Sequence, residues 1–386
     1  MTCDAKKLMM LSIQGQMSSP WVPPFHVWSD PGEGKTATCN WLVDSYEIDL
    51  FHKDAVPQAM PADFAGYAAP DFDNGVMRML PPKHAKDIQN LGGSAFILYD
   101  ELGDAPRSTQ SAAHGALLDK RLGEVDMVTD QNMVAMGGCS NPPTTNTTGE
   151  TLSWAVSNRL FHVWWDEGVD EWADNMEAGF PVADESTLLW LSEDWEKHVP
   201  KYRSLVKAFS RRFPDSIVMS GEARALRRQD SWKPWHSKRS WTHGVYMMAL
   251  CEGAGEMDLL DKALAGCVGE DVATEYFTWV NNLDIPDPEA VLADPSGFVM
   301  PPRGDQVYVL AISVIEAVKR KTTRDRWNAA WGILDRFVTG GFADIGSAMG
   351  SRLFQAGKGY GRPPNLSTQM LDIMREADPQ EGQGTR

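Results

Sequence analysis

The chain has 386 residues, of which 42% are hydrophobic. At about 100–200 residues per domain, this length predicts two domains or three. A formal net charge of −17 disfavours general binding to nucleic acid, because an acidic protein repels a polyanion. No uninterrupted apolar run reaches about 18 residues, so we expect no membrane-spanning helix and no membrane partner.

Five cysteines are scattered along the chain without a CxxC pair. This pattern is typical of reduced thiols in a cytoplasmic protein and predicts neither a disulfide framework nor a cysteine-bound zinc site. The apolar run near the N-terminus is short and lacks a small-residue cleavage site, so we expect no signal peptide. The eight histidines include no pair spaced as HxxxH, and we expect no metal site from them.

Short apolar runs alternate with helical patterns over roughly the first 165 residues, which predicts a parallel sheet with helices on both faces. The expected strands are 25–28, 95–99, 133–136 and 160–165, and the expected helices are 36–46 and 108–119. After residue 165 only helical spacing remains, at 204–213, 241–252, 257–267, 306–320, 324–338 and 366–377. We therefore expect an α/β domain over 1–168, a helical lid and C-terminal helical extension over 169–372, and a disordered tail over 373–386.

A phosphate-binding loop is predicted between the first strand and the first helix. Residues 29–36, Ser-Asp-Pro-Gly-Glu-Gly-Lys-Thr, match the P-loop pattern GxxxxGK[ST] except that Ser29 replaces the first glycine. The glycines let successive backbone N–H groups face the phosphates, Lys35 supplies a cation, and Thr36 offers a hydroxyl to Mg²⁺. The residues expected to hold ATP are Asp30, Pro31, Gly32, Glu33, Gly34, Lys35, Thr36 and Ala37.

An acidic pair follows the second predicted strand, where Phe-Ile-Leu-Tyr leads into Asp100 and Glu101. Asp100 is expected to hold Mg²⁺ directly or through water, and Glu101 to polarise the attacking water. A buried strand that ends at two surface acids is the alternative, and the P-loop upstream argues against it. Together the two motifs predict an αβα sandwich of the P-loop NTPase type that hydrolyses ATP.

With these motifs in place, the chain resembles the AAA+ ATPases and, within them, the MoxR-like branch. The segments that carry the resemblance beyond the ATP motifs are 60–67, 100–110 with 118–123, 137–143, 157–162 and 237–241. Lys238 stands where that branch usually has proline. The resemblance implies a ring, expected to be a hexamer, that remodels a protein partner in a chaperone-like way. The partner in this branch is often a von Willebrand A-domain protein. Similar compact chains occur in actinobacteria and their phages, so the expected location is the bacterial or host cytoplasm.

Three further residues are candidates for catalysis. Asn141 follows a short apolar strand, and its amide can orient the lytic water; an Asn-Pro turn is the alternative. The resemblance implies that Arg159 is the arginine finger and that Arg239 is the sensor-2 arginine. Arg107 and Arg121 remain weaker substitutes for these roles.

Two segments, 67–93 and 121–136, are predicted to be insertions. The first holds no clear strand–helix unit, whereas the second has the pattern of a hairpin. The resemblance implies that both face the pore or the surface of the ring, and packed structural insertions are the alternative. Charge is also uneven: 166–196 has eleven acids and no Lys or Arg, and 197–239 has twelve Lys or Arg against three acids. Solvated helix faces or a subunit contact explain this best, and a nucleic-acid groove of a motor or restriction-type translocase is the alternative.

Overall fold

The structure is a computed structural model that describes residues 4–146, 150–165, 167–180, 188–356, 360 and 366–377. Its internal contacts divide the chain into two compact units. The first comprises the residues up to Tyr202 together with Asp215–Glu275, and the second comprises Arg203–Pro214 together with the residues from Tyr276 onward. The helices of 215–275 thus belong to the same compact unit as the sheet. The predicted domain limits at 168 and 372 remain a prediction.

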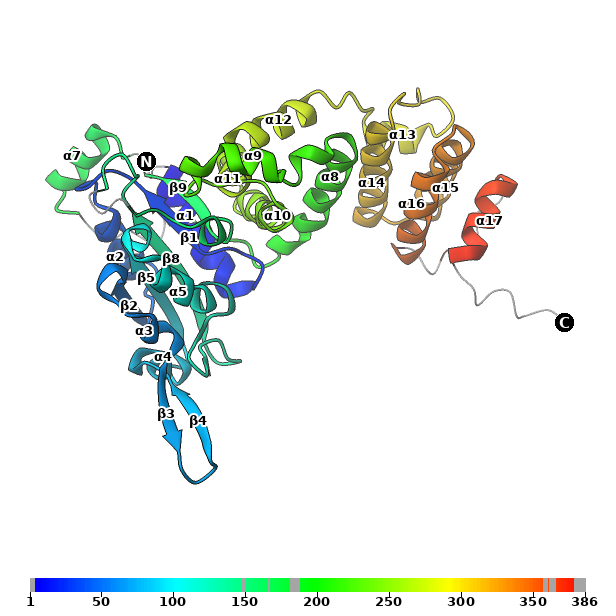
Figure 1. Cartoon of the computed structure of the whole chain (residues 1–386). Helices are drawn as coiled ribbons and strands as arrows, with labels where there is room; N and C mark the ends of the chain where they lie inside the picture. Colours follow the sequence, from blue (N-terminus) through cyan, green and yellow to red (C-terminus); the bar gives the residue numbers. More distant parts are fainter. Residues whose placement is uncertain are drawn as a thin grey trace. The chain divides into compact units, whose positions relative to one another are not determined.

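A five-stranded parallel sheet forms the centre of the first unit (Figure 1). The strands are β1 (Phe25–Trp28), β2 (Leu50–Ala55), β5 (Ser94–Asp100), β8 (Met133–Ser140) and β9 (Phe161–Trp164). Their order across the sheet is β2-β5-β8-β1-β9, and every neighbouring pair is parallel. The strand before the phosphate loop and the strand before the acidic pair are therefore separated by β8.

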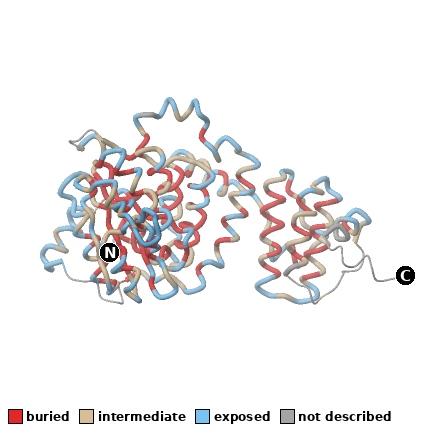
Figure 2. Tube along the Cα trace, turned by 60° about the horizontal axis from the view of Figure 1, so that its bottom comes forward, coloured by how far each residue is buried: buried red, intermediate tan, exposed pale blue. Residues whose placement is uncertain are grey.

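Helices cover both faces of this sheet because alternate side chains of each buried strand point to opposite sides. On one face, Ile97 and Tyr99 of β5 belong to a buried cluster with Phe64, Ala85 and Leu117. Those three residues come from α3 (Pro61–Ala65), α4 (Lys83–Gln89) and α5 (Arg107–Asp119). On the other face, α1 (Asp4–Ser18) packs on β8, and α2 (Lys35–Ser45) contacts β5. Figure 2 shows the buried residues of the trace in red. The parallel sheet with helices on both faces confirms the expected αβα sandwich.

Most of the remaining described elements are helices. In the first unit they are α6 (Trp154–Ser157), α7 (Val169–Glu177), α9 (Gly221–Leu226), α10 (Lys238–Gly253) and α11 (Leu260–Val268). Two helices, α8 (Val199–Arg212) and α12 (Glu270–Asn281), carry the chain between the units. The second unit has α13 (Pro288–Ala293), α14 (Gly304–Arg320), α15 (Arg324–Thr339), α16 (Ala343–Ala356) and α17 (Thr368–Ala377). Within the described residues, no helix is long and apolar enough to cross a membrane.

The C-terminal helix α17 includes residues 373–377, the first part of the segment expected to be disordered. Residues 378–386 of that predicted tail lie outside the described residues, as do Cys3, Asp166 and 181–187 of the acidic segment. The four described cysteines are free and buried.

The expectation that 67–93 holds no strand–helix unit is wrong. This segment forms the antiparallel hairpin β3 (Tyr67–Asp71) and β4 (Val76–Leu80) followed by α4, and Figure 1 shows the hairpin extending away from the sheet. The predicted second hairpin is confirmed as β6 (Arg121–Leu122) and β7 (Val125–Asp126). The two insertions meet at their bases, where the Gly123 N–H donates to the Phe64 carbonyl at 3.1 Å and the Met79 N–H donates to Glu124 at 3.2 Å.

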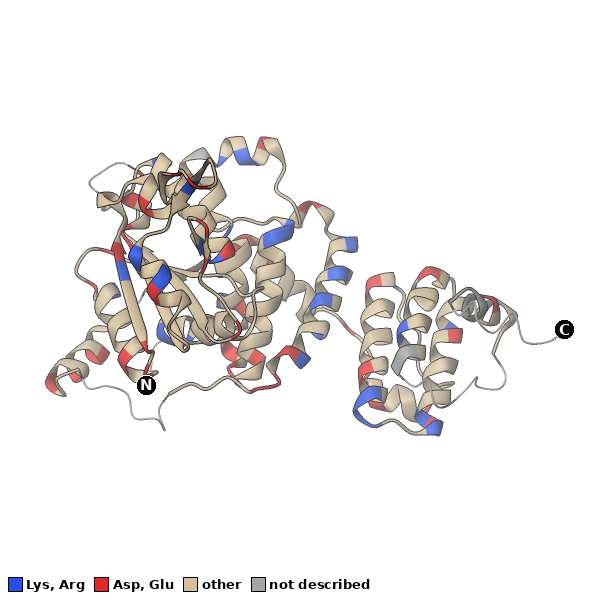
Figure 3. Ribbon diagram, turned by 90° about the horizontal axis from the view of Figure 1, so that it is seen from below, with Lys and Arg blue, Asp and Glu red and all other residues tan. Residues whose placement is uncertain are grey.

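The basic segment 197–239 makes ion pairs with carboxylates along its length; Figure 3 marks the positions of Lys and Arg in blue and of Asp and Glu in red on the ribbon. The pairs are Lys197–Asp194, Lys201–Glu252, Arg211–Asp344, Arg227–Asp271 and Lys233–Asp230. These pairs favour solvated helix faces over a nucleic-acid groove.

Candidate functional site

The strand order brings the phosphate loop, the acidic pair and Asn141 to one edge of the sheet. Because β8 lies between β1 and β5, the residue after β8 falls between the residues that follow its two neighbours. Lys35 Nζ lies 2.8 Å from Asn141 Oδ1, and Thr36 Oγ1 donates to Asp100 Oδ2 at 3.3 Å. Four residues predicted from three separate segments of the sequence are therefore joined by direct contacts.

The phosphate loop, 29–34, has the open backbone that its glycines predict. Gly32 and Gly34 have φ values of 92° and 81°, which favour glycine, and a Cβ atom on either would meet nothing within 4 Å. The expected residues from Asp30 to Gly34 and Ala37 are exposed around this concave turn. Lys35 Nζ is also 2.8 Å from the Ser29 carbonyl and 3.0 Å from the Asp30 carbonyl. Burial lowers the pKa of Lys35, and the nearby carboxylates, Asp100 among them, oppose this effect.

Asp100 is held from both of its oxygens, and two of its partners were not anticipated from the sequence. Lys53 Nζ of β2 lies 3.3 Å from Oδ2, and the Cys139 thiol donates to Oδ1 at 2.9 Å. Burial raises the pKa of Cys139 well above its usual range, so the thiol keeps its proton and donates it. The register alone could have indicated Cys139, because it lies opposite Asp100 on the neighbouring strand.

Glu101 is exposed and has a φ of 56°, the left-handed region that a non-glycine residue seldom adopts. It is the first residue after β5 and precedes the short 3₁₀ helix η2 (Leu102–Asp104). Its carboxylate is near enough to Asp104 to raise the pKa of that residue, in addition to the larger effect of burial. The turn therefore presents two acids toward the loop edge of the sheet.

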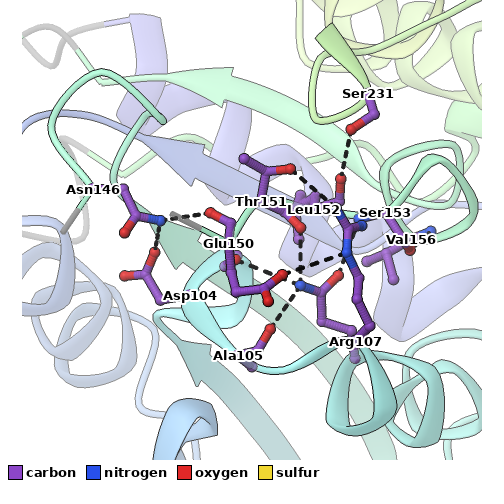
Figure 4. Close-up of polar contacts among 12 residues, drawn as sticks. Asp104, Ala105, Arg107, Asn146, Glu150, Thr151, Leu152, Ser153, Val156 and Ser231 are labelled. Atoms are coloured by element: carbon purple, nitrogen blue, oxygen red, sulfur yellow. Dashed lines mark hydrogen bonds and ion pairs between the residues drawn. The ribbon is translucent and has the colours of Figure 1, made fainter. Parts of the chain in front are cut away.

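Hydrogen bonds between side chains and backbone atoms link the turn after Glu101 to α6 (Figure 4). Buried Gln110 of α5 donates to the carbonyls of Ala105 and Thr151 at 3.0 Å each, and it accepts from the Ser153 N–H at 3.0 Å. Ser153 in turn caps α6 by accepting from the Val156 N–H at 3.2 Å. Gln110 thus positions the segment after the acidic pair relative to the helix that ends beside Arg159. Its central place was not anticipated from the sequence.

Asp104 predicts a specific pH dependence of stability. Burial, followed by the Glu101 carboxylate, raises its pKa to about 6, whereas an aspartate in an unfolded chain titrates near pH ~3.9. Between these values the folded protein keeps a proton that the unfolded chain has lost, so the contribution of Asp104 to stability falls as the pH rises from about 4 to 6.

We expect Asp104→Asn to remove this part of the pH dependence. Urea unfolding near pH 4.5 and near pH 7 measures it: the wild type should lose more stability than the variant on going from the lower to the higher pH. Equal changes in the two proteins would mean that Asp104 is not the group that titrates.

Arg159 and Arg239 lie near enough to each other for their charges to interact. Arg159 follows α6, and its Nη1 donates to the Ala155 carbonyl at 2.6 Å; Arg239 is in the first turn of α10, which Ser237 caps. Burial and then the Arg239 charge lower the pKa of Arg159, and both arginines lower the pKa of His114 after burial. The two predicted arginines therefore form a pair, whereas the hydrogen bonds of Lys35 join it to Ser29, Asp30 and Asn141.

The two weaker candidates have acidic partners of their own. Arg107 Nε lies 3.5 Å from Glu150, a contact drawn in Figure 4, and Arg121 Nε lies 3.6 Å from Asp126 of the second hairpin. Both side chains are about half exposed, so neither is locked in place.

Comparison with protein-family models and with curated proteins gives no match. Among the solved structures that match this chain is a candidate ATPase from Cytophaga hutchinsonii, determined at 2.00 Å resolution. It is 17% identical, the similarity covers 69% of this chain and 80% of that one, and the TM-score is 0.40. We base the functional assignment on the site itself.

Proposed function

We propose that the chain binds and hydrolyses ATP at the loop between β1 and α2, as one subunit of a ring. The observation that carries this proposal is the meeting of Lys35, Thr36, Asp100 and Asn141 at one edge of a parallel sheet. Phosphoryl transfer requires a loop that cradles the phosphates, a lysine that contacts them and an acid that binds the metal ion. Here these are the open glycine loop, Lys35 with its oxygen partners, and Asp100 at the end of β5, two strands away from β1 in the sheet.

The residues also fit the Mg²⁺ that accompanies ATP. Thr36 Oγ1 and Asp100 Oδ2 face each other at 3.3 Å, and two oxygens bound to an octahedral Mg²⁺ at about 2.0–2.1 Å lie about 3 Å apart. When bound, Mg²⁺ would neutralise part of the charge on the β- and γ-phosphates. Asp100 is oriented for this role by Lys53 and Cys139, which hold its two oxygens.

The side chains around the phosphate have distinct tasks. Lys35 exchanges some of its contacts with loop carbonyls for phosphate oxygens, which form stronger, charge-assisted hydrogen bonds. Asn141, already in contact with Lys35, orients the water through its amide. Glu101 takes the proton of that water as general base. Its exposure allows it to reach a water at the mouth of the loop.

The arginine pair supports a ring in which each site is completed by a neighbouring subunit. Arg159 and Arg239 lie near enough to each other for their charges to interact, whereas the hydrogen-bond partners of Lys35 are Ser29, Asp30 and Asn141 of the same chain. We infer that both serve the nucleotide of the next subunit, with Arg159 as the finger and Arg239 as the sensor-2 residue. The resemblance to MoxR-like AAA+ proteins supports a hexamer in the cytoplasm, with residues 1–168 binding nucleotide and the helices of 169–372 moving as a lid and extension.

The protein partner would meet the exposed hairpin β3–β4. Its surface carries large apolar side chains, and Phe72 at its turn is 88% exposed. Other exposed apolar residues of the hairpin are Tyr67, Val76, Met77 and Leu80. Such a patch is typical of a surface that binds protein. These observations support chaperone-like remodelling of a partner, for which a von Willebrand A-domain protein is the first candidate. The ion pairs of 197–239 disfavour the alternative, a nucleic-acid motor.

Lys35→Ala tests the ATP site. We expect isothermal titration to show no measurable ATP binding, because the phosphates lose the cation that neutralises them. Lys7→Ala is the matched control, since it removes the same charge from an ion pair with Glu256 outside the site. ATP affinity near that of the wild type in Lys35→Ala would exclude the loop as the nucleotide site.

A further inference from the structure

Three potential metal ligands meet on the face of the sheet that is covered by α4. They are His52 and Asp54 of β2 and His84 of α4. One ligand atom from each lies within 4.8 Å of the other two. The His52 Nε2 atom is 2.9 Å from Asp54 Oδ1, and the His52 and His84 rings are stacked with centroids 3.8 Å apart. No other group of this kind is found among the described residues.

The local structure places all three side chains on the same side. His52 and Asp54 are two residues apart on a strand, so they point to the same face. They lie opposite Ile97 and Tyr99 of β5, whose side chains belong to the buried cluster that includes α4. His84 is in the first turn of α4, one residue before the buried Ala85. The cluster therefore joins the edge strand of the sheet to the helix that covers it.

We propose that His52, Asp54 and His84 bind one divalent transition-metal ion of the Zn²⁺ type, which ties β2 to α4. Two imidazoles and one carboxylate are ligands that suit Zn²⁺ and its neighbours Co²⁺ and Ni²⁺, whereas Mg²⁺ prefers oxygen ligands alone. Three protein ligands leave the fourth position of a tetrahedral ion to water. This site is separate from the nucleotide site, and the inference does not depend on ATP hydrolysis.

Further features of the cluster favour a cation. The His84 Nε2 atom is buried and has no hydrogen-bond partner in the part of the chain that the structure describes, and a buried nitrogen without a partner is costly. Burial and the neighbouring His52 lower the pKa of His84, so its ring is neutral near pH 7, the form that binds a metal. Asp87 and Asp63, besides Asp54, add negative charge near the ring.

Binding requires a small movement of the ligands. Two donors at about 2.0–2.1 Å from one tetrahedral ion lie about 3.4 Å apart, while the present separations reach up to 4.8 Å. The stacked rings must also tilt toward each other so that each nitrogen lone pair points at the ion. Both histidines are partly exposed, so there is room for this rotation.

The expected role of the ion is to fix the base of the exposed hairpin. The strand β4 ends at Leu80, and only Pro81 and Pro82 separate it from α4. An ion that holds His84 against β2 therefore anchors the C-terminal limb of the hairpin. Because the unfolded chain does not keep the three ligands together, the ion would also stabilise the folded state in proportion to its binding free energy.

The test is isothermal titration of the full-length protein with ZnCl₂ and, in parallel, CoCl₂. The titration is done without nucleotide and with an excess of Mg²⁺, so that the oxygens of Thr36 and Asp100 do not contribute to the measured binding of Zn²⁺ or Co²⁺. The variants are His84→Ala and the isosteric Asp54→Asn. His198→Ala is the matched control. His198 Nδ1 is 3.2 Å from Glu252, and this pair is about as exposed as His52 and Asp54. Among the described residues, however, His198 does not belong to a group of three potential metal ligands.

We expect the wild type and His198→Ala to bind one equivalent of Zn²⁺, to melt at a higher temperature when it is present, and to give the visible absorption of tetrahedral Co²⁺. Binding to His84→Ala and Asp54→Asn should be weaker by more than about 100-fold, since even residues that only support a metal ligand change affinity by about 10–100-fold. Circular dichroism establishes that each variant is folded. The proposal is overturned if the wild type binds no Zn²⁺, or if a folded Asp54→Asn binds it as tightly as the wild type. Either result would leave His52 and Asp54 as a simple ion pair.

Discussion

Glu101→Gln should keep ATP binding intact and lower the turnover number by about 10²–10⁴-fold, the range for loss of a general base. Glutamine keeps the shape of the side chain and its capacity for hydrogen bonding, but it cannot take a proton from water. The φ of 56° at this position is unfavourable for glutamate and for glutamine alike, so the change adds no new strain. Steady-state ATP hydrolysis and isothermal titration of ATP measure the two quantities separately.

Glu47→Gln is a close control for this substitution. Glu47 is also exposed and has a φ of 48°, and it lies at the end of α2 away from the loop. The Glu47→Gln variant should hydrolyse ATP at the wild-type rate. A normal rate in Glu101→Gln would mean that another group, such as Asp104, activates the water. If the rate does collapse, the variant holds ATP without turnover, and the same protein can be used to capture a partner bound in the ATP state.

Removing either arginine of the pair should lower ATP hydrolysis without abolishing ATP binding. A guanidinium placed beside the transferring phosphoryl group stabilises the charge that develops in the transition state. Such arginines contribute about 10³–10⁵ to the rate in GTPases, and we expect a smaller effect for Arg159→Ala and a smaller one again for Arg239→Ala. Alanine at Arg107 or Arg121 serves as the control, since each of these already has an acidic partner.

Mixed rings decide whether the arginines act on the neighbouring subunit. Alone, Lys35→Ala subunits are expected to be inactive and Arg159→Ala subunits to hydrolyse ATP poorly. Mixing them creates interfaces with an intact loop on one side and an intact arginine on the other, so activity should return. The same should hold for Lys35→Ala mixed with Arg239→Ala. Mixed rings that are seen by native mass spectrometry and remain inactive would contradict action in trans.

The parts of the fold that the sequence predicts well are those that local patterns determine. The strand 25–28, the helix after the loop and α5 begin and end within about a residue of the prediction, because each has a buried apolar stripe and a clear boundary. The strand β8 is longer than predicted. Gly137 and Gly138 suggested a turn, yet a Cβ atom on Gly137 would lie 2.4 Å from the ring of Phe25. Glycine is required there by packing across the sheet, which a local pattern does not reveal.

Three of the strands that were missed lack a buried apolar pattern. The edge strand β2 begins with Leu50 and Phe51 and continues with His52, Lys53 and Asp54, and none of its residues is fully buried. The strands of the first hairpin are mostly exposed, and the first of them contains Pro70. The sequence of such a strand shows no pattern of buried apolar residues, because backbone pairing rather than side-chain burial holds the strand in place.

The candidate site shows the same division. Lys35, Asp100 and Asn141 were placed correctly beside one another because each ends or follows a strand of a parallel sheet. Other neighbours are far apart in the sequence: His52 and His84 by 32 residues, and Arg159 and Arg239 by 80. Only the packing of the folded chain brings them together. The roles of these residues remain predictions.

The apolar hairpin also has a consequence for how this protein behaves in solution. A net charge of −17 makes the molecules repel one another at low ionic strength, where the charge acts over a range of about 30 Å at 0.01 M salt. At about 1 M salt that range shrinks to about 3 Å, and the exposed ring of Phe72 and its neighbours can then come into contact between molecules. Colloidal stability should therefore fall as salt is added, which is the opposite of what is expected for an assembly held together by surface ion pairs.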